Sequence, residues 1–94
     1  MTVNYEALGR YVASEEAIKE LLLKQTQLAH QIDRLLTKTK NHYPATKIIR
    51  VIETALLVEL STELNHVHSN LMVAIDEINS YADDAKKPKI DLIS

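Results

Sequence analysis

Hydrophobic residues are densest in the segment Ile48–Leu60, IIRVIETALLVEL, where nine of thirteen positions are apolar. At about 100° per residue on a helix, these side chains cover far more than one stripe. Val51 and Val58 fall nearly opposite the side that carries Ile49, Ile52 and Leu56. One partner helix within a chain of 94 residues is too little to cover them all. The pattern therefore predicts self-association, or a second protein, on this surface. We expect an oligomer interface formed by Ile48, Val51, Ile52, Ala55, Leu57 and Val58.

The stretch 15–40 has a helical period, with apolar residues at steps of three and four positions. They form one wide face, made of Ile18, Leu21, Leu22, Leu28, Ala29, Ile32, Leu35 and Leu36. Lys38 and Lys40 suit the negative end of a helix that ends near residue 40.

A second, longer helix is predicted over 44–82. Pro44 is well placed as its first residue and disfavours helix at Tyr43. Its continuous stripe consists of Ile49, Ile52, Leu56, Leu60, Leu64, Val67, Leu71, Ala74, Ile75 and Ile78.

A short helical segment is expected over 4–13, with Asn4 as its N-cap. Ser14, followed by Glu15 and Glu16, has the pattern of a fresh N-cap with acidic residues in the first turn. We therefore expect a bend near Ser14, with one continuous helix as the alternative.

These elements predict an all-α fold, in which a short connection joins two antiparallel helices into a hairpin. With the turn near His42, the numbers of facing residues should add up to about 84. A lone hairpin has little core, so we expect a homodimer forming a four-helix, coiled-coil-type bundle. Residues 1–84 are expected to form one domain, and 85–94 a flexible or docking tail that stability does not need. The candidate docking residues of the tail are Ile90, Leu92 and Ile93.

Composition supports long helices, because the chain has one Gly, two Pro and no Trp, Phe or Cys. The absence of Cys removes disulfides and thiolate chemistry. We expect neither a signal peptide nor a membrane-spanning segment, and hence a cytoplasmic protein without a membrane partner.

The net charge of −2 is unevenly distributed. Residues 51–84 contain seven carboxylates and no Lys or Arg, whereas cations dominate residues 33–50. This cationic segment is a candidate contact for phosphates or for an acidic protein surface, through Arg34, Lys38, Lys40, Lys47 and Arg50. Nucleic acid is the less favoured partner, because the whole chain is slightly acidic.

Candidate chemistry is sparse. Glu59, Glu63 and His66 include an E-x-x-H pattern that could bind metal in a dimeric bundle, but this pattern is weak and we expect no metal or cofactor. No Gly-rich phosphate loop or nucleophile motif is present, so we expect no enzyme activity.

The sequence favours a non-enzymatic, self-associating protein-interaction module. A small adaptor, an inhibitor or a chaperone-like accessory factor has this size and architecture, and so do accessory factors of phages and mobile elements. A nucleic-acid-binding dimer and a metal-binding bundle are the alternatives.

Overall fold

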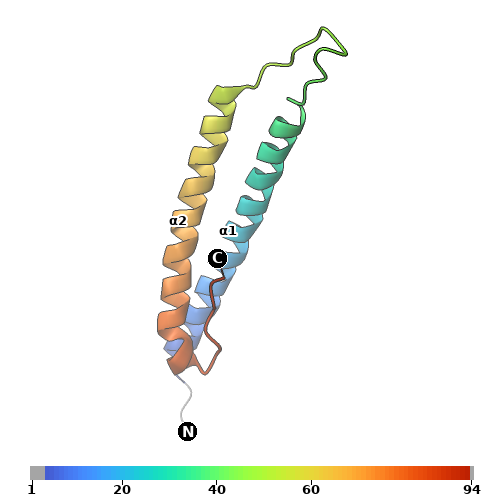
Figure 1. The fold of residues 1–94 in the computed structure, drawn as a ribbon. Coiled ribbons are helices and arrows are strands. Elements are labelled where there is room, and N and C mark those ends of the chain that lie inside the picture. The colour runs from blue at the N-terminus through green and yellow to red at the C-terminus, as the bar shows by residue number, and fades with distance from the viewer. Residues whose placement is uncertain (1–3, 94) are drawn as a thin grey trace.

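The computed structural model describes residues 4–93, which form two helices and no strand. α1 comprises Tyr5–Thr37 and α2 comprises Thr54–Ala85. They lie side by side and run in opposite directions, so the chain is an all-α antiparallel hairpin, as the sequence predicts (Figure 1).

α1 is one continuous helix of 33 residues, so the expected bend near Ser14 is wrong. Asn4 is the N-cap, and its side-chain oxygen accepts a hydrogen bond from the Ala7 N–H at 3.0 Å. Ser14 does not cap a new helix, because it is buried against α2 at a position of the helix–helix seam. The helix ends at Thr37 instead of residue 40, and the Thr39 hydroxyl donates to the Leu36 carbonyl at 2.7 Å.

The connection between the helices is a long loop, residues 38–53, and the short turn predicted from the sequence is wrong. α2 begins at Thr54, ten residues later than expected, and ends at Ala85. A helix starting at Pro44 would extend past the end of α1 and leave Ile48–Ile52 without a helix to pack against. Within the loop, the Arg50 N–H donates to the Asn41 side-chain oxygen at 2.7 Å, which closes residues 41–50 into a ring.

The seam between the helices has a strict alternation of three- and four-residue steps. In α1 the buried and half-buried seam residues are Ala7, Tyr11, Ser14, Ile18, Leu21, Gln25, Leu28, Ile32 and Leu35. In α2 the matching series is Leu57, Leu60, Leu64, Val67, Leu71, Ala74, Ile78, Tyr81 and Ala85. This spacing is that of an antiparallel coiled coil. Facing residue numbers add up to about 91, as for the hydrogen-bonded pair Arg10 and Tyr81, because the loop is longer than predicted.

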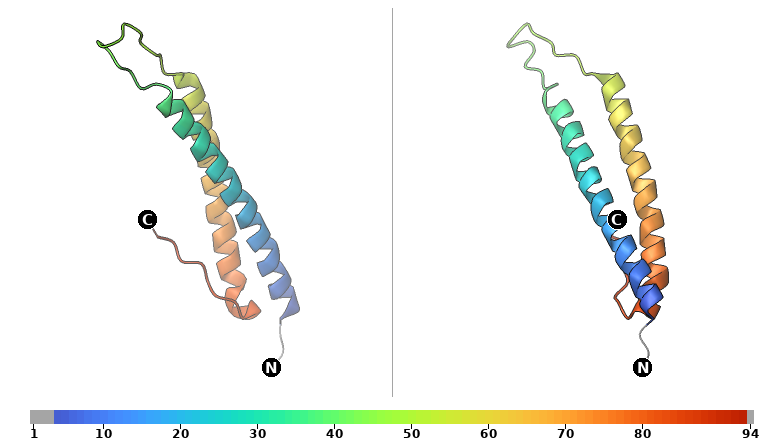
Figure 2. Two further views of the ribbon diagram at one scale, coloured as in Figure 1. Left: turned by 90° about the vertical axis from the view of Figure 1, so that its right-hand side faces the viewer. Right: turned by 180° about the vertical axis from the view of Figure 1, so that it is seen from behind.

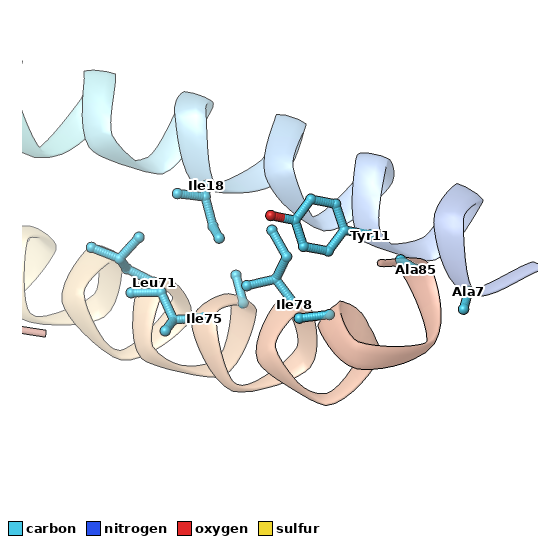
Figure 3. Close-up of a cluster of buried hydrophobic side chains, with 9 residues drawn as sticks. Ala7, Tyr11, Ile18, Leu71, Ile75, Ile78 and Ala85 are labelled. Atoms are coloured by element: carbon cyan, nitrogen blue, oxygen red, sulfur yellow. The ribbon is translucent and has the colours of Figure 1, made fainter. Parts of the chain in front are cut away.

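Most of the buried side chains lie at the end of the hairpin opposite the loop (Figure 3). This basal cluster consists of Ala7, Tyr11, Ile18, Leu71, Ala74, Ile75, Ile78, Ala82 and Ala85. Ile78 is its most deeply buried large side chain, with 1% of its surface exposed. The basal cluster is therefore the main hydrophobic core of the chain.

The C-terminal segment folds back on the base of the hairpin. Lys86 adopts a left-handed conformation, and the Lys87 N–H donates to the Ala82 carbonyl, as in a Schellman motif. The Asn79 side-chain amide then binds both backbone groups of Ile90, at 2.8 and 3.1 Å. Ile90 packs on the basal cluster, and the Tyr11 hydroxyl donates to the Pro88 carbonyl. Residues 86–90 are therefore packed on the base of the hairpin, and that stability does not need the tail stays a prediction.

The hairpin is long and thin, with extents of 73 × 20 × 16 Å and a radius of gyration of 20.1 Å. A compact chain of this length has a radius of gyration of about 12 Å. The helices move apart toward the loop, as Figure 1 and the right panel of Figure 2 show.

Candidate interaction surface

The half of the hairpin nearer the loop is packed less tightly than the base. This distal half consists of residues 21–37 and 54–70, and its two buried side chains, Leu28 and Leu60, keep 8% and 7% of their surface exposed. Its other seam residues are only half-buried, namely Leu21, Gln25, Ile32, Leu35, Leu57, Leu64 and Val67. Hollows lie along the side of this seam, and Leu35, Leu56 and Leu60 contribute apolar walls to one of them. One chain thus leaves much of its own distal seam in contact with solvent.

The residues predicted to form the oligomer interface lie at this end of the molecule but in different environments. Ile48, Val51 and Ile52 belong to the loop and are exposed, with 84% of Val51 accessible. Ala55 and Val58 lie on the exposed side of α2, whereas Leu57 belongs to the seam and is half-buried. The structure therefore brings the predicted set to one end of the hairpin without joining it into one helical face.

A second exposed apolar feature follows α1 just outside the seam. Leu22, Ala29 and Leu36 each come one residue after a seam position, and their seven-residue spacing keeps them on one side of the helix. Leu22 and Leu36 are 45% and 46% exposed. We call these three residues the outer ridge. The sequence placed them in one broad apolar face with the seam residues, and only the strict three–four spacing of the seam separates them.

The predicted cationic contacts surround the loop. Residues 34–52 contain five Lys and Arg side chains and no carboxylate. Within residues 4–93, none of these five cations, which are Arg34, Lys38, Lys40, Lys47 and Arg50, forms an ion pair. The Lys47 ammonium lies 5.0 Å from the centre of the exposed Tyr43 ring, a cation–π distance.

The part of the hairpin next to this loop has the opposite charge. Residues 15–33 and 54–75 contain six carboxylates, namely Glu15, Glu16, Glu20, Asp33, Glu59 and Glu63, against two lysines. Lys19 contacts Glu15 and Glu16 at 3.5 Å, and Glu16, followed by Glu15, raises the pKa of the Lys19 ammonium. The loop with the adjoining Arg34 is thus positively charged. Residues 15–33 and 54–75, which we call the acidic middle, carry a net negative charge.

The metal candidates do not assemble into a ligand set in one chain. Glu63 and His66 line a hollow between the helices, which Lys24 and Gln31 also line. Across residues 4–93, the structure brings together no group of three His, Asp or Glu side chains that could hold a metal ion. Glu59 is exposed on α2.

The tail candidates divide into two groups. Ile90 docks on its own chain, whereas Leu92 and Ile93 are exposed beyond it. At the base, the guanidinium of Arg10 donates to the Tyr81 hydroxyl at 3.2 Å and pairs with Glu6 at 2.9 Å, and these contacts raise the pKa of Arg10.

Neither helix within residues 4–93 combines the length and apolar character needed to cross a membrane. Comparison of the chain with models of protein families, with curated proteins and with solved structures finds no match.

Proposed function

We propose that the chain is a non-enzymatic protein-interaction module that works as a homodimer, in which two hairpins form a four-helix bundle. The observation that carries this proposal is the open distal half: the seam there is half-buried, and the outer ridge beside it is exposed. Apolar residues directly beside a coiled-coil seam are typical of helices that contact two neighbouring helices. A second hairpin supplies the missing neighbours.

The solvent-accessible surface area of one chain is large enough for an interface with a second hairpin. The chain exposes 7405 Å², whereas a compact monomer of the same mass exposes about 5,500 Å². The excess of about 1,900 Å² exceeds the ~800 Å² that each partner buries in a standard stable interface. Burying part of it in a dimer compensates for the small core of one hairpin.

Two neighbouring leucines allow a matched test of the dimer. Leu22→Glu places a charge on the outer ridge, whereas Leu23→Glu places the same charge one residue further, on an exposed position facing away from α2. We expect size-exclusion chromatography with light scattering to show a dimer for the wild type and for Leu23→Glu. Leu22→Glu should weaken association at least about tenfold, because a buried unpaired charge is costly. Equal masses for all three proteins would refute the proposed interface.

Nucleic-acid binding is a second candidate, supported by the cations around the loop and by the exposed ring of Tyr43. If the five cations contact phosphates, the logarithm of the binding constant should fall with the logarithm of salt concentration with a slope of about −4. Fluorescence anisotropy with labelled single- and double-stranded DNA measures this slope. Lys47→Glu with Arg50→Glu should abolish binding, and a salt-independent signal that survives these changes would exclude the candidate.

A further inference from the structure

The outer ridge has a feature that a two-fold symmetric contact would use. Ala29 is the small residue between two leucines, and the surface of α1 is hollowed around it. α2 presents another small residue, Ser61, at the same level of the hairpin, again one position after a seam residue. Small residues on both helices at one level allow the backbones of a second hairpin to approach closely there.

We propose that two copies pack face to face and antiparallel, with the two-fold axis at the level of Ala29 and Ser61. This inference rests on the proposed function, and it adds the orientation and centre of the dimer. α1 then lies against α1 of the second copy and α2 against α2. Because Leu22 and Leu36 are each seven residues from Ala29, Leu22 of one copy lies opposite Leu36 of the other. Each leucine thereby covers an exposed leucine of its partner.

Charge decides between this orientation and the parallel one. In a parallel dimer the two loops lie side by side, and each has four cations, namely Lys38, Lys40, Lys47 and Arg50, against Glu53 alone. In the antiparallel dimer the cationic loop of each copy lies beside the part of the other copy's α1 that carries Glu15, Glu16 and Glu20. Charges separated by less than the screening length of about 10 Å still interact at moderate salt, so these opposite charges favour the antiparallel arrangement.

Polar groups near the axis agree with this orientation. The hollow around Ala29 is lined by Gln25 and Thr26 on one side and by Asp33 on the other. An antiparallel two-fold places Asp33 of one copy opposite the amide donor of Gln25 of the other, because 33 and 25 lie equally far from Ala29.

The same geometry gives partners to the exposed aliphatic residues at both ends of the hairpin, in the loop and in the tail. Asn79, which holds the tail, is about five helical turns from Ser61 and thus lies on the same side of α2. The tail therefore leaves the base on the side of the proposed contact face, and its end stands away from the helices (Figure 2, left). The antiparallel dimer brings Ile48 and Val51 of the second copy toward the exposed Leu92 and Ile93.

Disulfide cross-linking tests the arrangement directly, because the chain has no cysteine of its own. Single variants Ala29→Cys and Ser61→Cys are oxidised in the full chain and examined on non-reducing gels, with Leu23→Cys as the exposed control. A disulfide requires Cα atoms about 4.4–6.8 Å apart, so cross-linking reports local pairing. We expect Ala29→Cys and Ser61→Cys each to cross-link with itself far more than Leu23→Cys does. We also expect Leu22→Cys to cross-link with Leu36→Cys, while neither does so with itself.

Each of the other possible cross-linking results would overturn a different part of the proposal. In a parallel face-to-face dimer α1 lies against α2 of the other copy, so Ala29→Cys would cross-link with Ser61→Cys in a mixture but not with itself. That result would overturn the inference and leave the homodimer intact. A dimer by light scattering in which these cysteines fail to cross-link would overturn the outer ridge as the contact. A monomer would refute the proposed function as well.

Discussion

Ile78→Ala tests whether the basal cluster is the main core. Ile78 is 1% exposed and lies where Tyr11 of α1 meets α2 (Figure 3). Truncating a buried isoleucine to alanine costs about 2–5 kcal/mol, because apolar contact is lost and a cavity remains. A two-helix structure can close part of that cavity, so we expect a loss of about 3 kcal/mol in the free energy of unfolding. For a domain of this size such a loss lowers the Tm by about 12–24 °C.

Urea and thermal unfolding, followed by far-ultraviolet circular dichroism, measure this loss. All samples need one protein concentration, because the stability of a dimer depends on it. Val73→Ala is the matched control, since Val73 lies on the same helix but is 58% exposed. We expect it to change stability by less than about 0.5 kcal/mol. A loss below about 1 kcal/mol for Ile78→Ala, or equal losses for both variants, would refute the reasoning.

Three further substitutions test local features by the same unfolding assay. Asn79→Ala should cost about 1–3 kcal/mol, because both backbone groups of Ile90 lose their partner, whereas the exposed Asn70→Ala should be near neutral; equal effects would show that the tail is not held this way. Ser14→Ala should be neutral or stabilising by up to about 0.5 kcal/mol, because Ser14 is inside α1, and a loss of about 1 kcal/mol would point to an N-cap instead. Gly9→Ala should stabilise by about 0.5–1 kcal/mol, since an added Cβ meets no atom within 4 Å; a destabilised protein would contradict the continuous helix.

Periodicity alone predicted the all-α hairpin and most of both helices. The stripe from Leu60 to Ile78 is buried or half-buried in α2, as expected, whereas Leu56 is 37% exposed. A long apolar stripe at helical spacing predicts a helix well, because it defines one face of the helix that has to be buried.

Local signals were misleading where tertiary contacts override them. Ser14 has an N-cap pattern, but the structure buries it in the seam with α2, inside one continuous helix. Pro44 has a helix-start pattern, but a helix there would have no neighbour beyond the end of α1, and the Asn41 side chain stabilises the loop instead. The Asn79–Ile90 contact that holds the tail joins an exposed-looking amide to a backbone, which leaves no pattern in the sequence.

The contact residues of the candidate surface remain predictions. Ile48 and Val51 were chosen because hydrophobic residues are dense there on an assumed helix, whereas the structure places them in the loop. The outer ridge was not separated from the seam, because Leu22 and Leu36 differ from the neighbouring Leu21 and Leu35 only in burial. Such a difference depends on the rotation of α1 against α2, which spacing over one helix does not determine.

The central claim is that the distal half, open in one chain, is covered by a second copy. Sedimentation equilibrium of the unmodified full chain over a range of concentrations tests it most directly. We expect the mass to approach twice the 10.7 kDa of one chain and to fall on dilution by a monomer–dimer equilibrium. A mass of one chain at every concentration, with full helicity, would contradict the account and leave the distal half uncovered by any second copy.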